Sequence, residues 1–224
     1  MNGALGGSVG CAGRFIVLEG PDGSGKSTQA SLLTQWLRDA GVPLTTCRDP
    51  GGTRLGDRLR SILLDRHDCA IDMTTELLLY MAGRAQLVRE RIRPALDQGH
   101  WVLSDRFLMS NWVYQCFAGG VDDRVFHQVA EVAVGSTLPD LTLVLDLELE
   151  TALARTGGAR DRIEDRSWEY RQRVRQGFLE ASKRRIAVKP EGEVRVLDAS
   201  PCPDILLTRL QHEVRHALGF DPRP

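Results

Sequence analysis

The sequence predicts an α/β fold, a five-stranded parallel sheet with helices on both faces. Short apolar runs alternate along the chain with longer amphipathic stretches, as in successive strand–helix–strand crossovers. The run LTLVLDL at 141–147 is almost continuously apolar, which is typical of a strand buried on both sides. A glycine-rich loop follows the first run, at the strand end where such sheets bind ligands.

The elements follow from these patterns in chain order. The predicted strands are the apolar runs 14–20, 44–49, 101–106, 141–147 and 194–199. The predicted helices are the amphipathic stretches 26–39, 54–65, 74–97, 122–134, 148–156, 166–187 and 203–217. Residues 1–13 are small and barely charged, so we expect a disordered lead-in, then one domain over 14–217 and a tail over 218–224.

Composition restricts the class of protein. The chain has 224 residues, 42% of them hydrophobic, which suits one domain with a full core. A net charge of −1 gives no overall field for a nucleic acid or a membrane surface, and no apolar run reaches the roughly 20 residues of a membrane span. The five cysteines are scattered, with no CxxC pair, and predict reduced thiols in a cytoplasmic protein.

The segment GPDGSGKST predicts a polyphosphate site. Gly20, Gly25, Lys26 and Ser27 complete the pattern GxxxxGK[ST] between a strand and a helix. Backbone N–H groups of such a loop surround the phosphates, the lysine reaches the β- and γ-phosphates, and the serine hydroxyl ligates Mg²⁺. The predicted ATP-binding residues of the loop are Gly20, Pro21, Asp22, Gly23, Ser24, Gly25, Lys26, Ser27 and Thr28.

Polar side chains at the strand ends indicate a phosphate acceptor. The chain lacks the NKxD motif of a GTPase. Asp105 can hold the water shell of Mg²⁺ and Arg106 can bind a phosphate bidentately, unless the two form only a surface ion pair. Arg48, Asp105 and Arg106 are expected to converge on one crevice. Asp22 is unusual in a phosphate loop and is explained if it faces a sugar hydroxyl or the metal.

A second group of residues could read a nucleobase. Tyr80 and Arg84 are four residues apart on a predicted helix, so an aromatic ring and a guanidinium share one face, although a core tyrosine and a solvated arginine are an alternative. The amide of Asn111 can bond N3–H and O4 of a pyrimidine, and Tyr114 could crowd the 2′ position of a sugar. The segment SNWVYQ thus presents Ser110, Asn111, Tyr114 and Gln115.

Six segments in this order resemble the thymidylate kinases, over roughly residues 14 to 217. These segments are FIVLEGPDGSGKSTQ, RDPGGTRLGDRLRSILL, ELLLYMAGRAQLVRERIRPAL, WVLSDRFLMSNWVYQ, PDLTLVLDL and DRIED. The resemblance implies a P-loop NTPase-type fold, transfer of the γ-phosphate of ATP to dTMP giving dTDP, Mg²⁺ as cofactor, and a homodimer.

The resemblance also implies roles for individual acceptor-side residues. Asp22 would contact the 3′-hydroxyl of dTMP. Tyr80 would stack on thymine and Arg84 would bond its O4. Asn111 would bond the thymine edge, and Tyr114 would select deoxyribose. The implied substrate-binding set is Asp22, Arg48, Tyr80, Arg84, Arg106, Ser110, Asn111, Tyr114 and Gln115, with Arg48 and Arg106 near the acceptor phosphate.

A segment near residues 155–166 resembles the lid that closes over ATP in this family. Some members carry a catalytic arginine in the phosphate loop where this chain has Gly23, so the resemblance is to the bacterial-type branch, in which lid arginines serve instead. Arg155 would pack against adenine. The implied catalytic residues are Lys26, Asp22, Arg106, Arg160 and Arg162, and the implied metal-linked residues are Ser27 and Asp105.

Three residues and the lid depart from the family pattern. Asp49 stands where glutamate is usual, Met109 and Trp112 are unusual beside the acceptor site, and the lid is short. Two alternatives stay open: another nucleoside monophosphate or deoxynucleoside kinase, or a non-catalytic nucleotide-binding module. Turnover of a panel of nucleoside monophosphates distinguishes the first alternative from a kinase specific for dTMP. The second predicts nucleotide binding without formation of dTDP.

Overall fold

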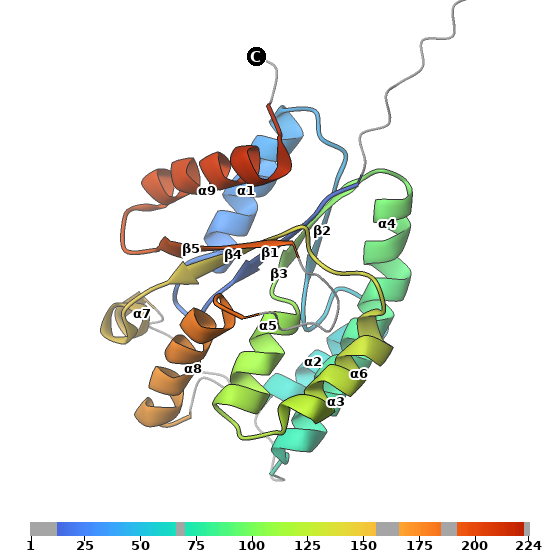
Figure 1. The fold of residues 1–224 in the computed structure, drawn as a ribbon, viewed down its shortest axis with the longest axis vertical. Coiled ribbons are helices and arrows are strands. Elements are labelled where there is room, and N and C mark those ends of the chain that lie inside the picture. Colours follow the sequence, from blue (N-terminus) through green and yellow to red (C-terminus); the bar gives the residue numbers. More distant parts are fainter. Residues whose placement is uncertain (1–12, 66–69, 156–165, 185–191, 222–224) are drawn as a thin grey trace, which may run out of the picture.

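The fold is a parallel sheet with helices packed on both faces (Figure 1). The computed structural model describes the chain over residues 13–65, 70–155, 166–184 and 192–221. The strands are β1 (Phe15–Glu19), β2 (Leu44–Arg48), β3 (Trp101–Asp105), β4 (Leu141–Asp146) and β5 (Glu193–Asp198), and their order in the sheet is β2-β3-β1-β4-β5. Every pairing is parallel, and each strand lies within one residue of its predicted bounds.

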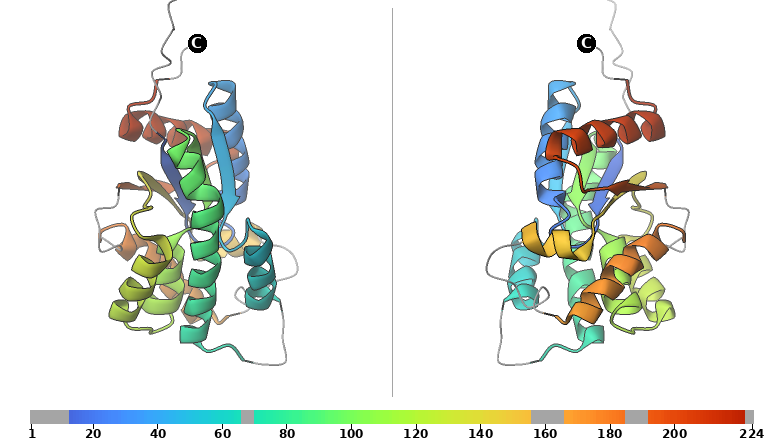
Figure 2. Two further views of the ribbon diagram at one scale, coloured as in Figure 1. Left: turned by 90° about the vertical axis from the view of Figure 1, so that its right-hand side faces the viewer. Right: turned by 90° about the vertical axis from the view of Figure 1, so that its left-hand side faces the viewer.

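The helices follow the predicted amphipathic stretches, with one addition. They are α1 (Lys26–Asp39), α2 (Arg54–Leu64), α3 (Met73–Leu87), η1 (Val88–Ile92), α4 (Arg93–Asp97), α5 (Leu108–Asn111), η2 (Trp112–Phe117), α6 (Asp123–Val134), α7 (Leu149–Arg155), α8 (Trp168–Ala181) and α9 (Pro203–Leu218). The prediction over 74–97 corresponds to α3, η1 and α4, which form one rod with a π-helical segment (Figure 2). The helical segment over 108–117 was missed because it is buried nearly all round and shows no polar face.

The sheet separates two apolar cores. Phe15 and Val17 of β1 face the core formed with α3, η2, α6 and α8. Ile16 and Leu18 alternate with them and face the core formed with α1 and α9. Figure 1 shows α1 and α9 together on one side of the sheet and α3, α6 and α8 on the other. Each of these four side chains is at most 1% exposed, so β1 is fully enclosed.

The boundaries of the domain differ from prediction at the C-terminal end. Leu218 is the last residue of α9, and the Phe220 ring lies 5.5 Å from the Trp36 ring and 4.9 Å from the Trp101 ring. The packed domain therefore continues into the predicted tail, because an aromatic side chain there covers the α1–α9 core. The predicted lead-in and lid fall almost entirely outside the described residues. Within the described part of the chain, no helix is both long and apolar enough to cross a membrane.

The topology brings three strand ends together. β1 lies between β3 and β4, and β2 lies on the far side of β3. In the register, Asp105 pairs with Leu18 on one side and Arg48 on the other. The phosphate loop leaves β1 at Glu19, so the polar residues that end β1, β2 and β3 meet at one edge of the sheet.

Candidate active site

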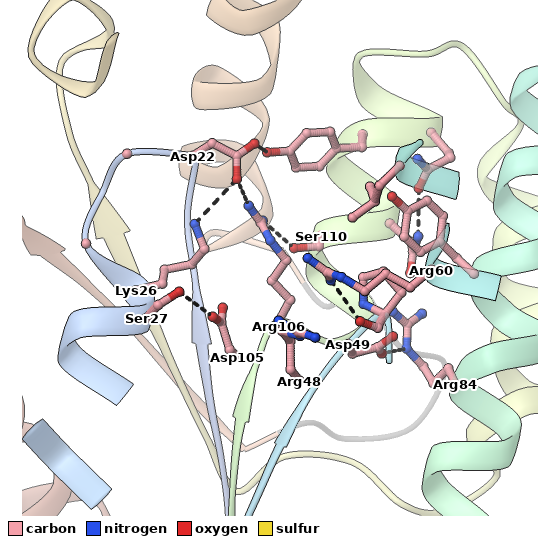
Figure 3. Close-up of a pocket in the computed structure, with 18 of the residues that line it drawn as sticks. Asp22, Lys26, Ser27, Arg48, Asp49, Arg60, Arg84, Asp105, Arg106 and Ser110 are labelled. Carbon is pink, nitrogen blue, oxygen red and sulfur yellow. Dashed lines mark hydrogen bonds and ion pairs between the residues drawn. The ribbon is translucent and has the colours of Figure 1, made fainter. Parts of the chain in front are cut away.

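A pocket of about 490 Å³ opens at this edge of the sheet (Figure 3). The predicted site residues that line it are Asp22, Gly23, Gly25, Lys26, Ser27, Thr28, Arg48, Tyr80, Arg84, Asp105, Arg106, Ser110, Asn111, Tyr114, Gln115 and Arg155. Gly20 and Pro21 lie behind it and contribute backbone carbonyls, while the Ser24 side chain is fully buried. Arg160 and Arg162 lie outside the described residues. The expected convergence of Arg48, Asp105 and Arg106 on one crevice is observed.

The phosphate loop holds its lysine in a mostly buried position. The Lys26 ammonium donates to the Pro21 carbonyl at 2.8 Å and lies 3.9 Å from the Asp22 carboxylate. Burial and the charge of Arg106 lower the pKa of Lys26 to about 8, although nearby carboxylates oppose the shift. The site therefore holds a cation that gains from the arrival of an anion such as a phosphate.

The loop has no room for a side chain at its fourth residue. Gly23 has a φ of +81°, and a Cβ there would lie 2.3 Å from the Ala152 carbonyl oxygen of α7. Glycine alone adopts this conformation without strain. The backbone of the loop and the end of α7 are thus in direct contact.

Ser27 and Asp105 offer oxygen ligands at the inner end of the loop. The Ser27 hydroxyl donates to Asp105 Oδ2 at 3.0 Å, and Asp105 Oδ1 is buried with no hydrogen-bond partner among the described residues. A hydroxyl and a carboxylate are the kinds of ligand that Mg²⁺ takes, with waters and phosphate oxygens completing its shell. The described residues contain no group of three or more histidine, cysteine or acidic side chains that could hold a metal ion.

Asp22 is partly exposed, but its carboxylate faces hydrogen-bond donors and cations. Its carboxylate pairs with the Arg106 guanidinium and accepts from the Tyr114 hydroxyl at 3.0 Å. Burial raises the pKa of Asp22, but the charges of Arg106 and Lys26 and the Tyr114 hydrogen bond outweigh burial and lower it to about 2. This arrangement accounts for a carboxylate in a phosphate loop, because positive charge surrounds it.

Arg106 is fixed from several sides. Its φ is +70°, a left-handed conformation uncommon for a non-glycine residue. One end of the guanidinium donates to the Gly20 carbonyl and to the Ser110 hydroxyl, both at 3.0 Å, and the Tyr114 ring lies 5.4 Å away. The carbonyl of Arg106 itself accepts from Ser104 at 2.8 Å. Strained backbone held by this many contacts is typical of functional sites.

Arg84 is buried on the opposite wall, so the alternative of a solvated arginine is wrong. Its side chain is 1% exposed and forms an ion pair with Asp49, which is equally buried. The guanidinium also donates to the Phe107 carbonyl at 3.1 Å and contacts Met81 Sδ at 3.3 Å. Tyr80 lines the pocket from the same helix, α3. Figure 3 shows Arg84 beside Asp49, with Arg48 reaching into the cavity.

The remaining predicted residues occupy the two ends of the pocket. Arg155 donates to the carbonyls of Ala199 and Ser200 at 3.0 and 3.1 Å, which fixes it against the loop after β5. Asn111 donates to Gln115 at 2.7 Å, and both amides are buried. The Asn111 oxygen has no hydrogen-bond partner among the described residues.

Comparison with known proteins agrees with this geometry. The thymidylate kinase family model matches residues 18–199. The chain belongs to the thymidylate kinase family. The reaction of that family is the ATP-dependent phosphorylation of dTMP to dTDP, so the chain is a nucleoside monophosphate kinase.

The relatives cover nearly the whole chain. The thymidylate kinase of Symbiobacterium thermophilum is 46% identical over 216 residues, which span 94% of this chain and 99% of that protein. The thymidylate kinase of Marinomonas sp. is 41% identical over 204 residues, or 90% and 94% of the two chains. The crystal structure of the Ehrlichia chaffeensis thymidylate kinase superposes with a TM-score of 0.73 at 27% identity, covering 91% of this chain and 99% of that chain.

Two of the departures from the family pattern face the core. Met109 and Trp112 are 6% and 3% exposed, belong to the α3–α6–α8 core and do not line the pocket. The Trp112 indole donates to Asp123 at 3.0 Å. Both residues therefore act on packing around α5 and η2. Asp49 differs from them, because it lines the pocket and pairs with Arg84.

Sequence reasoning missed two polar residues, one beside this pocket and one lining it. Glu19 is fully buried and accepts from Phe107 N at 2.8 Å, from Ser110 N at 3.1 Å and from the Ser110 hydroxyl at 2.5 Å. Burial raises its pKa, against the charge of Arg106. Arg60 of α2 lines the pocket and donates to the Pro50 carbonyl at 2.9 Å. For Glu19 the sequence did offer a signal, because a glutamate ends an apolar strand just before a phosphate loop.

Proposed function

We propose that this pocket binds ATP on its phosphate-loop side and dTMP on the side of α3 and α5, and transfers the γ-phosphate between them. One observation carries the proposal: Lys26 and Ser27 share a single pocket with Tyr80, Arg84 and Asn111. A nucleotidase or a regulatory ATP site has no need of a buried base-reading wall facing the phosphate loop. Phosphoryl transfer depends mainly on positioning and on neutralising charge, which such a pocket supplies.

On the donor side, Lys26 would contact the β- and γ-phosphates, and the backbone of the loop would surround them. Ser27 and Asp105 would hold Mg²⁺. Bound there, the ion would neutralise charge on the phosphates and orient them. Arg155 would lie against adenine, a role supported by its anchoring to the loop after β5.

On the acceptor side, Tyr80 would stack on thymine, Arg84 would donate to O4 and Asn111 would bond N3–H. Burial of Arg84 supports this assignment, because a guanidinium held in place by Asp49 recognises a carbonyl without losing side-chain entropy on binding.

The sugar and the acceptor phosphate would lie nearer the loop. Asp22 would accept from the 3′-hydroxyl, and Tyr114, which donates to Asp22, would exclude a 2′-hydroxyl. Arg48 and Arg106 would bind the acceptor phosphate. Arg48 is exposed within the pocket, and no described group forms an ion pair or a hydrogen bond with its guanidinium, so it is available for an incoming anion.

Arg160 or Arg162 would neutralise charge in the transition state. The proposal rests on the resemblance of the surrounding sequence to the family lid, since neither residue is among those described. Separate substitutions of the two residues to alanine test it, and substitution of the catalytic arginine should lower kcat by about 10³-fold or more. If neither variant changes kcat, the charge is neutralised by other groups.

The proposal includes a cytoplasmic homodimer. Exposed apolar side chains on adjacent helices support the dimer: Leu55 of α2, Leu78 of α3, and Val125 and Val132 of α6. Val132 is the most exposed of the four, at 89%. Light scattering of the purified chain tests it, and a monomer at micromolar concentration would contradict it.

A coupled assay of ADP release tests the substrate assignment. The acceptor panel is dTMP, dUMP, dCMP and dGMP, with a control without acceptor. We expect dTMP to be the best acceptor, dUMP to follow within about 10- to 200-fold because one methyl group separates them, and dCMP and dGMP to be poor. Best turnover with a purine or cytosine nucleotide would overturn the thymine assignment.

A further inference from the structure

A series of buried hydrogen bonds links the Asn111 amide to the ion pair between Glu76 of α3 and Arg166. Asn111 Nδ2 donates to Gln115 Oε1 at 2.7 Å, and Gln115 Nε2 donates to Glu76 Oε1 at 2.8 Å. The Arg166 guanidinium donates to both oxygens of Glu76, at 3.0 and 2.7 Å. The side chains of Asn111, Gln115 and Glu76 are at most 2% exposed, so water does not substitute for any of these contacts.

The Glu76 end of this series determines which groups donate hydrogen bonds and which accept them. Arg166 can only donate hydrogen bonds, and both Glu76 oxygens face its guanidinium, so the carboxylate acts as an acceptor throughout. Gln115 must therefore turn its NH₂ group toward Glu76 and its oxygen toward Asn111. Asn111 must in turn direct its NH₂ group to Gln115. The Asn111 oxygen is then the acceptor left for a ligand, and that atom is buried without a partner among the described residues.

We infer that Glu76 is a positioning residue for base specificity, because it sets the polarity of the Asn111 amide through Gln115. The inference rests on the proposed function, in which Asn111 meets the base. An amide oxygen without another partner can accept from the N3–H of thymine or uracil. Cytosine presents a bare nitrogen acceptor at N3, which would face that oxygen with no proton between them.

Glu76 does not line the pocket, so an effect that acts through the polarity of Asn111 should appear as discrimination among bases. Glu76 lies on the opposite side of Gln115 from the pocket. A residue that only supported the fold would affect all acceptors alike. A residue that sets amide polarity changes the ratio between N3–H bases and cytosine.

The variant Glu76→Gln tests the inference. Its amide oxygen would accept from Arg166 and its NH₂ group would face Gln115, so Gln115 and then Asn111 would rotate and present an NH₂ group to the base. The ratio of kcat/KM for dCMP to that for dTMP should rise about 10- to 100-fold. The ratio of dUMP to dTMP should stay within about two-fold, because both bases carry N3–H.

The matched control is Glu90→Gln. Glu90 also accepts from a glutamine amide, that of Gln86, but the pair is exposed on the surface and outside the pocket. This control should leave both ratios unchanged. A second variant, Gln115→Leu, interrupts this series of hydrogen bonds without altering Glu76 or Arg166 and decides the question if Glu76→Gln does not fold. It should raise the dCMP-to-dTMP ratio less than Glu76→Gln does, because Asn111 is then free in both orientations.

The outcomes separate this inference from the proposed function. Wild-type enzyme inactive with dTMP overturns the proposed function itself. If the wild type is active and Glu76→Gln lowers kcat/KM equally for dTMP, dUMP and dCMP, the inference is overturned, since Glu76 would then be purely structural. A dCMP-to-dTMP ratio that rises while the dUMP-to-dTMP ratio holds supports it. In Gln115→Leu, unchanged ratios likewise overturn it.

Discussion

The two sides of the pocket are built in different ways. The phosphate-loop side consists mainly of one contiguous segment, residues 20–28, with backbone groups and a single lysine. The acceptor side assembles side chains from β2, α3, α5 and η2, and holds them with buried polar pairs such as Asp49–Arg84. Changes on the loop side should therefore affect ATP binding and catalysis, whereas changes on the acceptor side should affect dTMP binding, specificity and folding together.

The largest expected effect lies where the two sides meet, at Arg106. Arg106→Ala removes a guanidinium that contacts Gly20, Asp22 and Ser110 and that we assign to the acceptor phosphate. We expect kcat to fall about 10²- to 10³-fold, as for loss of one preorganised transition-state donor. Steady-state kinetics with saturating ATP and dTMP measure it.

Arg106→Lys is the control for charge. It keeps one positive charge but loses the planar fork of donors, so its loss should be intermediate. If Arg106→Ala transfers phosphate at the wild-type rate, the assignment of Arg106 to the acceptor phosphate is wrong.

The next effect tests whether the acceptor wall is also structural. Asp49→Ala leaves the Arg84 guanidinium buried without its carboxylate, which should lower the free energy of unfolding by about 3–5 kcal/mol. Urea denaturation measures it. Asp57→Ala is the matched surface control, because that exposed carboxylate accepts from Gly52 N at 3.0 Å and forms no ion pair with another described residue, and it should lower the free energy by about 1 kcal/mol. Equal losses of unfolding free energy in the two variants would mean that the buried Asp49–Arg84 pair stabilises the fold no more than a surface contact does.

A smaller effect separates binding from turnover. Tyr80→Ala should raise the KM for dTMP about 10- to 100-fold with little change in kcat, because stacking on a base stabilises bound substrate and transition state alike. Tyr80→Phe keeps the ring and should stay within about three-fold of wild type. A fall in kcat with an unchanged KM would place Tyr80 elsewhere in the mechanism.

The smallest effect is a pH dependence on the phosphate-loop side. With the pKa of Lys26 at about 8, the ammonium is largely protonated at pH 7 and largely neutral at pH 9 in the free enzyme. Phosphate binding requires the charged form, so the KM for ATP should rise as pH increases through 8, by up to about ten-fold. Initial rates across pH 7–9 with saturating dTMP measure it. A KM for ATP that is flat or falls over this range would show that Lys26 stays charged.

The same contrast explains what could be predicted from the sequence. The sheet, its strand bounds and the phosphate loop were predictable because short-range patterns determine them: an apolar run, a glycine spacing and an amphipathic period. Tyr80 and Arg84 were identifiable as neighbours because four residues along a helix bring side chains to one face.

The contacts that fix the acceptor side were not predictable in this way. The pairing of Asp49 with Arg84, and of Glu76 with Arg166, joins residues 35 and 90 positions apart. Helix 108–117 was missed for a related reason, since a helix enclosed by apolar neighbours loses the polar face that would reveal its period. Long-range packing determines these features, and no local pattern records them.

Transfer of label from γ-³²P-ATP is the most direct test of the central claim that one pocket joins donor and acceptor. With Mg²⁺ and dTMP, we expect the label to appear in dTDP, one per ADP formed, with almost no ADP or inorganic phosphate released when dTMP is absent. Label in inorganic phosphate at the same rate with or without dTMP would contradict the account, because the wall formed by α3 and α5 would then not be an acceptor site.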